Sequence, residues 1–159
     1  MKKITLYSLS LPAVIAAVST DEPVEITFRI MSEEIQRHPA LGLYDFIKMS
    51  SKTPNIHFKF DLMGVMSQHG LLIMLAVEKK NRRVSIHSAI HISKDSSYTK
   101  GSVDEILKGA ESAIRVIDRV ALNITSECDI TRPELDDWIK EDKYLDRDEL
   151  AMFDILGDE

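Results

Sequence analysis

Hydrophobic and polar residues change their spacing within residues 56–77, and this change predicts a strand followed by a buried helix. From Ile56 to Leu62 the two kinds alternate, which is the period of a strand with one buried face. Beyond Gly64 a largely apolar run predicts a helix from Gln68 to Lys79. We expect the chain to turn at Gly64 and functional groups to lie at this junction, because the N–H groups of a helix start point outward there.

The same two periods predict the other elements of the chain. Period-two alternation predicts strands at residues 3–7, 24–30 (VEITFRI) and 83–92. Spacings of three and four residues predict helices at residues 9–18, 41–49, 103–124, 133–141 and 147–153, of which 103–124 is long and amphipathic. An irregular loop is expected at 31–39, and a flexible polar loop at 94–101.

This alternation of strands and helices predicts an α/β fold with a largely parallel sheet. Parallel strands need crossover connections, and such connections are right-handed in nearly all proteins. The chain has 159 residues, 44% of them hydrophobic, which is enough to bury one core. We therefore expect a single domain over residues 1–159.

Composition excludes several classes of protein. The net charge of −6 argues against a nucleic-acid partner, and we interpret the basic cluster at residues 79–83 as a solvated turn. No apolar run reaches the roughly 18 residues of a membrane-spanning helix. Residues 1–19 resemble a secretory signal, but Pro12 and several hydroxyl residues interrupt the apolar stretch. Cys128 is the only cysteine, so nothing indicates an oxidising compartment, and we expect the cytoplasm.

The histidines do not predict a metal site. His87 and His91 share one face of the predicted strand 83–92, but four residues along a strand separate them by roughly 13 Å. That distance is too large for one ion, and no third ligand is evident. We expect neither a metal nor another cofactor.

The order of elements resembles the ClpP-type serine peptidases, within the larger ClpP/crotonase superfamily. The resemblance runs from about Ile4 to the end of the chain and rests on three features. These are the strand VEITFRI with the following Met31-Ser32, the helix segment Gly42-Leu43-Tyr44-Asp45, and the strand–Gly64–helix junction with the terminal segment 142–156. It implies a ClpP/crotonase-like fold whose long helix, 103–124, takes part in ring assembly.

The resemblance also shows where the family's oxyanion site would lie. In the family, a turn of the form Asn-Ser-Pro-Gly-Gly supplies the backbone N–H donors, and the matching stretch here is residues 31–35, MSEEI. Glu34 and Ile35 replace the two glycines. A β-branched residue resists positive φ, and a carboxylate opposes developing negative charge, so an oxyanion site is not expected.

Two of the three family triad positions carry other residues. Aligning Gly64 and Gly70 on the glycines around the family nucleophile places Gln68 at the serine position. Matching the next strand places Ser93 at the histidine position, and Asp142 matches the family aspartate. Neither the nucleophile nor the base of an acyl transfer is therefore expected at these positions.

An alignment shifted by one residue leaves a second hypothesis open. Ser67 would then be the nucleophile, with His69 or His91 as base and Asp142 as the orienting acid. A residue two positions along a helix points to nearly the opposite side, which disfavours His69 as the partner of Ser67.

The sequence thus predicts a catalytically degenerate ClpP-like protein. We expect a non-catalytic subunit or regulator that assembles with itself, or in a mixed ring with a ClpP-type subunit. The short N-terminal helix resembles ClpP-like proteins of bacteriophages and prophages. An acyl-CoA-binding protein of the crotonase kind is a third possibility, but it too would need backbone donors where Glu34 lies.

Overall fold

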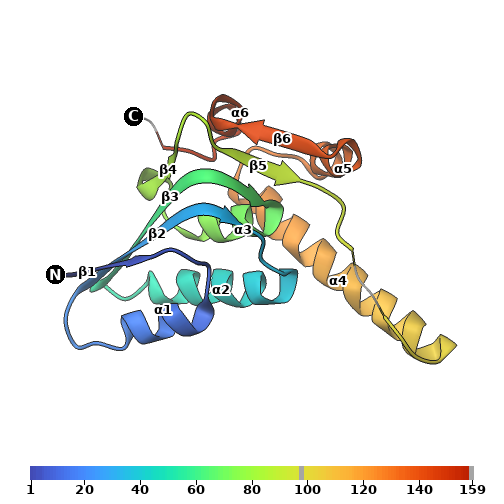
Figure 1. The fold of residues 1–159 in the computed structure, drawn as a ribbon, viewed down its shortest axis with the longest axis horizontal. Helices are drawn as coiled ribbons and strands as arrows, with labels where there is room; N and C mark the ends of the chain where they lie inside the picture. The colour runs from blue at the N-terminus through green and yellow to red at the C-terminus, as the bar shows by residue number, and fades with distance from the viewer. Residues whose placement is uncertain (97–98, 158–159) are drawn as a thin grey trace.

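A twisted sheet with helices packed on one face forms the body of the protein, seen in a computed structural model that describes residues 1–96 and 99–157 (Figure 1). The strands are β1 (Lys2–Leu6), β2 (Val24–Glu33), β3 (Ile56–Ser67), β4 (Arg82–Val84), β5 (Ala89–Ile92) and β6 (Lys143–Asp146). Their order is β1-β2-β3-β5-β6, and β4 also pairs with β3. All pairs are parallel except β5–β6, which confirms the α/β fold with a largely parallel sheet.

The helices are α1 (Leu11–Val18), α2 (Arg37–Ser50), α3 (Gln68–Ala76), α4 (Val103–Glu127), α5 (Arg132–Glu141) and α6 (Arg147–Met152), with a short 3-10 turn η1 (Lys79–Asn81). Helices α1, α2 and α3 lie under the sheet, and α5 and α6 flank β6 (Figure 1). The core lies between the sheet and α2 and α3, where Phe28, Phe60 and Leu72 are fully buried. In the described part of the chain, no helix combines the length and apolarity needed to cross a bilayer.

The prediction of a chain turn at Gly64 is wrong, because β3 runs through Gly64 to Ser67. A Cβ atom on Gly64 would lie 1.4 Å from the Met31 carbonyl oxygen, so glycine is required by the close approach of β2. The β2–β3 register shifts at the same place, between Ile30 and Ser32. Gly64 therefore accommodates an irregularity of the neighbouring strand.

Other element boundaries also differ from the predictions. Strand β2 continues to Glu33 and α2 begins at Arg37, which shortens the expected loop 31–39 to three residues. The expected strand 83–92 is two strands, because residues 85–88 form a turn in which Ser88 N–H donates to the Ser85 carbonyl. Strand β6 has only four residues, two of them charged, so the hydrophobic pattern of the sequence did not predict it. Within the predicted loop 94–101, residues 97 and 98 lie outside the described residues.

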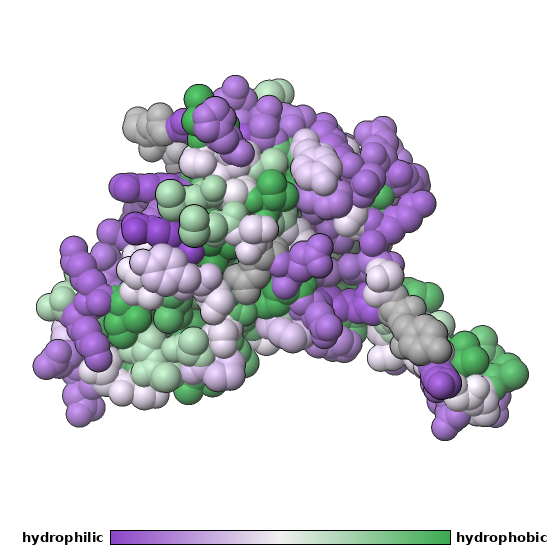
Figure 2. All heavy atoms as spheres, in the orientation of Figure 1, coloured by the Kyte–Doolittle hydropathy of each residue, from purple (hydrophilic) through white to green (hydrophobic). Residues whose placement is uncertain are grey.

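Helix α4 extends away from the body of the protein along its first half (Figure 1). A Ser102–Glu105 capping box begins the helix, and its buried residues are Val120, Ala121 and Ile124, all in the second half. Apolar side chains are visible at the projecting end in Figure 2. The first half of α4 thus makes few contacts with its own subunit.

Candidate functional site

The candidate site lies at the carboxyl ends of β3 and β5. These strands are parallel neighbours, so Ser67 at the end of β3 and Ser93 just after β5 reach the same edge of the sheet. A cleft of about 680 Å³ opens there, and it is lined by residues 34–38, 67–69 and 93–96. Glu34, Ile35, Ser67, Gln68 and Ser93 all line it, so the structure brings five of the six predicted site residues to one cleft.

Gln68, the first residue of α3, joins β3 to the loop after β5. Its side chain is almost completely buried, with 6% of the residue exposed. Its Nε2 donates to the Ser93 carbonyl oxygen at 2.7 Å, and the Ser93 N–H donates to its Oε1 at 3.0 Å. The Gln68 amide therefore donates one hydrogen bond to the Ser93 backbone and accepts one from it, as a residue of a neighbouring strand does. Both polar atoms of the amide, Nε2 and Oε1, are engaged.

Ser67 ends β3 with a buried hydroxyl. Its Oγ makes no hydrogen bond to any residue that the structure describes. On the adjacent strand, His91 is the register partner of Ser67, and its Nε2 lies 2.9 Å from Asp142 Oδ1. Ser67 and His91 are therefore neighbours on adjacent strands, and Asp142, at the end of α5, contacts the histidine.

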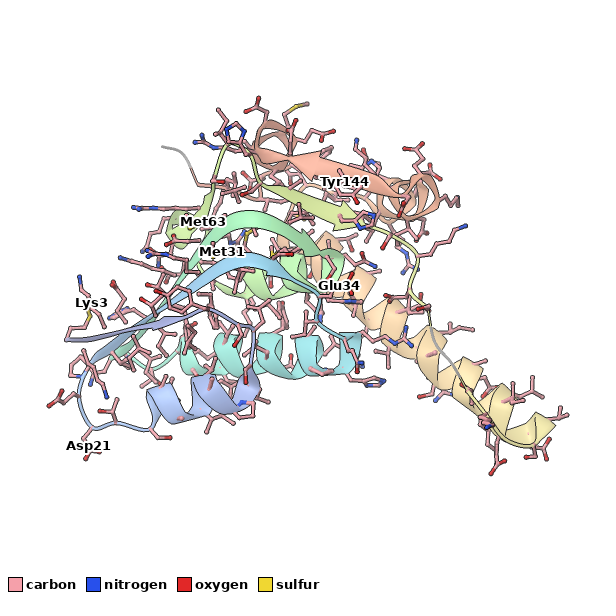
Figure 3. The ribbon with its side chains drawn as sticks, in the orientation of Figure 1. Lys3, Asp21, Met31, Glu34, Met63 and Tyr144 are labelled. Carbon is pink, nitrogen blue, oxygen red and sulfur yellow. The ribbon has the colours of Figure 1, made fainter. Side chains whose placement is uncertain are left out.

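The orientation of the His91 ring separates these groups. The ring stacks on Tyr144 of β6, with centroids 4.2 Å apart and planes 9° from parallel, and Tyr144 is labelled in Figure 3. The Nε2 atom of the same ring is engaged by Asp142. The Ser67 hydroxyl makes no hydrogen bond to His91 or to any other described residue, so His91 is not in place as its base in this arrangement.

Asp142 lies apart from the cleft residues. It ends α5 in the left-handed conformation, with φ of 56°, and its side chain is largely exposed. Its contact with the candidate site is made through His91 alone among the described residues. The structure therefore places this member of the predicted set at the rim of the sheet, outside the cleft that Gln68 and Ser93 share.

The loop positions matched to the oxyanion turn lie between β2 and α2. Glu34 is exposed at the cleft and is labelled in Figure 3. Ile35 packs against the core, which anchors this loop through its side chain. With a carboxylate facing the cleft, the loop presents negative charge where an oxyanion would need donors.

A buried ion pair, which the sequence analysis did not find, closes the other side of the cleft. His69 Nε2 lies 3.2 Å from Asp95 Oδ2, and Arg37 Nη1 lies 3.5 Å from the same oxygen. Burial raises the pKa of Asp95, but His69 and Arg37 more than offset this, so that its pKa is below the usual value. These three residues lie on α2, α3 and the loop after β5, and no sequence spacing relates them.

The arrangement offers little to a metal ion or cofactor. No group of three histidine, cysteine or acidic residues in the described part of the chain has metal-binding geometry. The polar side-chain atoms of Gln68 are used within the protein, and so are Nε2 of His69 and Oδ2 of Asp95. The chemistry available at the cleft is that of hydrogen bonding, with one unpartnered hydroxyl at Ser67.

Comparison with known proteins gives consistent results. A family model described as Clp protease matches residues 10–156. Among solved structures, a mutant of ClpP1 from Listeria monocytogenes is similar, with a TM-score of 0.70 and 18% sequence identity, over 98% of this chain and 88% of that one. At this identity the likeness is one of fold. A search of curated proteins found no match.

Proposed function

The chain belongs to the Clp protease family, and from this premise we propose that it is a catalytically inactive member, serving in the cytoplasm as a structural or regulatory subunit of a Clp-type assembly. One observation carries the proposal. The side-chain amide of Gln68, which the resemblance aligns with the family's nucleophile, is held by two hydrogen bonds to the backbone of Ser93, which it aligns with the family's histidine. On this alignment, a structural contact takes the place of the groups that would transfer an acyl chain and a proton.

The surroundings of Gln68 support the same proposal. Acyl transfer needs a nucleophile, an oriented base and donors for the oxyanion. Ser93 offers a hydroxyl and no imidazole, and Glu34 adds a carboxylate to the loop that would hold the oxyanion. Supplying one of these parts would leave the other two missing.

A second candidate function is an active serine peptidase that uses Ser67. It is favoured by the unpartnered Ser67 hydroxyl beside His91, which is itself bonded to Asp142. The His91 ring stacks on Tyr144, and no hydrogen bond joins it to Ser67 among the described residues. We therefore place this function second.

The exposed apolar stripe of α4 supports a role in assembly. Val103, Leu107 and Ile114 recur at spacings of four and seven residues, so they share one side of the helix, and their exposed fractions are 73%, 57% and 59%. Apolar surface of this extent on a projecting helix is characteristic of a protein contact. We propose a homo-oligomer, or a mixed ring with a ClpP-type subunit, in which this stripe is covered.

Two measurements on the purified protein test the proposal. We expect no labelling by a serine-directed fluorophosphonate, with an active ClpP-type subunit as the positive control. We also expect light scattering to give a mass above one subunit, alone or after mixing with that ClpP-type subunit. Labelling that disappears in Ser67→Ala would establish the second candidate, and a monomer in both samples would overturn the assembly role.

A further inference from the structure

The loop that follows β5 carries a carboxylate into the cleft around Gln68. This carboxylate belongs to Asp95, whose side chain is 16% exposed. Its Oδ2 atom lies 3.2 Å from His69 Nε2 and 3.5 Å from Arg37 Nη1. The side chains of His69 and Arg37 are themselves only 8% and 13% exposed. One oxygen of a loop residue is thus held between two helices, α3 and α2, to which the loop does not belong.

Both partners of this carboxylate lie in the first turn of a helix. Arg37 is the first residue of α2, and His69 is the second residue of α3. The residues that precede these helices, Gln36 and Ser67, make no side-chain capping hydrogen bond with the described residues. The N–H groups of a first turn carry a partial positive charge, which stabilises an anion placed near them. Two helix starts, a guanidinium and an imidazole therefore meet on one side of the cleft.

A carboxylate is the group that such a site accepts. The planar guanidinium of Arg37 and the imidazole of His69 can each donate an N–H to a carboxylate oxygen. Burial raises the pKa of Asp95, yet its contacts with these two side chains keep that pKa below the usual value. The site therefore favours the ionised form of the carboxyl group that it holds, although this group is partly removed from water.

Asp95 reaches the site from a loop that is attached to the body of the protein before and after it. Before Asp95, the backbone of Ser93 exchanges two hydrogen bonds with the Gln68 side chain. After it, Thr99 packs closely on α4, where a Cβ atom on Gly109 would lie 2.6 Å from Thr99 Cγ2. Between these two attachments, the contact of Asp95 with Arg37 and His69 holds the loop against the cleft.

The charges at the cleft decide which ligand could take the place of Asp95. Glu34 is the other acidic residue of the lining, and it is exposed. A polyanion would be repelled by Glu34, whereas a ligand with one carboxylate can place it between the two cationic side chains. We infer that Arg37 and His69 form a binding site for a small monocarboxylate that the chain's own Asp95 occupies, so that residues 93–96 act as an autoinhibitory latch.

Removal of the Asp95 carboxylate should open the site to a free one, and thermal unfolding with sodium formate tests this. At constant ionic strength, we expect formate to raise the melting temperature of Asp95→Ala saturably, by about 2–4 °C, because it binds the folded state alone. Formamide, which has the shape of formate without its charge, should not. The unaltered protein should not respond to formate, because Asp95 fills its site. No response in Asp95→Ala, or an equal response in the unaltered protein, would overturn the inference.

Two further variants show where the formate binds. Adding Arg37→Gln to Asp95→Ala should weaken the formate response about tenfold or more, because the guanidinium is lost. Asp118→Ala removes a carboxylate that pairs with Arg132 outside the cleft, and it should not respond to formate. If Asp95→Ala does not fold, Asp95→Ser replaces it, since its shorter polar side chain also leaves room for formate. A full response in the double variant, or in Asp118→Ala, would contradict the site. None of these measurements depends on peptide hydrolysis or on assembly.

Discussion

The Gln68 side-chain amide and the Ser93 peptide group exchange two hydrogen bonds, of 2.7 and 3.0 Å. Gln68 thereby connects the start of α3 to the loop that follows β5. These two hydrogen bonds continue the parallel β3–β5 pairing beyond its last residue pair, Ser67 and His91. A serine side chain carries a single oxygen and is too short to make both bonds. The residue that the resemblance aligns with the family's nucleophile is therefore a structural support of the cleft.

This relationship predicts a cost for substituting Gln68. We expect Gln68→Ala to lower the free energy of unfolding by about 1–3 kcal/mol, because the half-buried backbone N–H and carbonyl of Ser93 each lose a partner. Gln68→Ser should be destabilised similarly and should show no peptide turnover, since a base and oxyanion donors remain missing. Urea unfolding and a fluorogenic peptide assay measure the two effects. Appreciable turnover in Gln68→Ser would mean that the base lies elsewhere in the cleft.

A glutamate at the same position adds a pH test. An ionised Gln68→Glu side chain can accept from the Ser93 N–H but cannot donate to the Ser93 carbonyl, whereas the protonated acid can do both. Its pKa should then be higher in the folded than in the unfolded state, so the variant's stability relative to the unaltered protein should improve as pH falls. Urea unfolding at pH 7 and pH 5 measures this, and an unchanged difference would contradict the pairing.

Gly64 and Gly42 form a matched pair for testing backbone packing. Gly64→Ala should cost about 3 kcal/mol or more, or prevent folding, because its Cβ would overlap the Met31 carbonyl oxygen. Gly42→Ala should instead stabilise by about 0.5–1 kcal/mol, since Gly42 is in α2 and its Cβ would be 3.8 Å from the nearest side-chain atom. Thermal unfolding compares the two, and equal effects would contradict the close approach of β2 and β3.

The half-buried Asp95 predicts a loss of stability in acid. Its pKa is lowered on folding, so its contribution is fully present above the pKa of the unfolded chain and disappears as pH falls through the folded value, below about pH 4. Asp95→Asn should be about 1–3 kcal/mol less stable at pH 7 and should change less between pH 5 and pH 3.

Asp21 provides the control for this acid effect. It is exposed and makes no ion pair with the described residues, so Asp21→Asn should keep the pH dependence of the unaltered protein. Urea unfolding at each pH compares the variants. A pH profile that Asp95→Asn leaves unchanged would show that other carboxylates cause the acid effect.

The stripe on α4 predicts how the subunits associate. Replacing Leu107 and Ile114 together by Glu should shift the protein to a smaller species in analytical ultracentrifugation, because charged groups would be buried at the contact. Both residues are exposed in the subunit, so its folded stability should change by only about 0.5 kcal/mol.

Lys108→Glu, on a neighbouring position of α4 outside the apolar stripe, is the control for charge on this helix. It should leave the sedimentation profile nearly unchanged. If the double variant sediments as the unaltered protein does, the contact lies on another surface.

Much of the fold followed from the sequence, because periodicity reports burial within one element. Strand 24–30 and helix 103–124 are regular enough that their apolar positions alone predict them, and their alternation with other elements predicts a parallel sheet. The sequence also predicted that Gln68 and Ser93 lie close together, since each follows the end of one of two adjacent parallel strands. These conclusions need only local pattern and the rules that connect neighbouring elements.

Tertiary structure alone decided the relationships between distant residues. In the sequence Gly64 resembles a turn residue. In the structure a glycine is needed there because the backbone of β2 approaches too closely for a Cβ atom. The Asp95 contacts with His69 and Arg37 arise where segments far apart in sequence meet. No period along the chain encodes such contacts, because they depend on the register of strands and on loop conformations that are fixed only when the whole core packs.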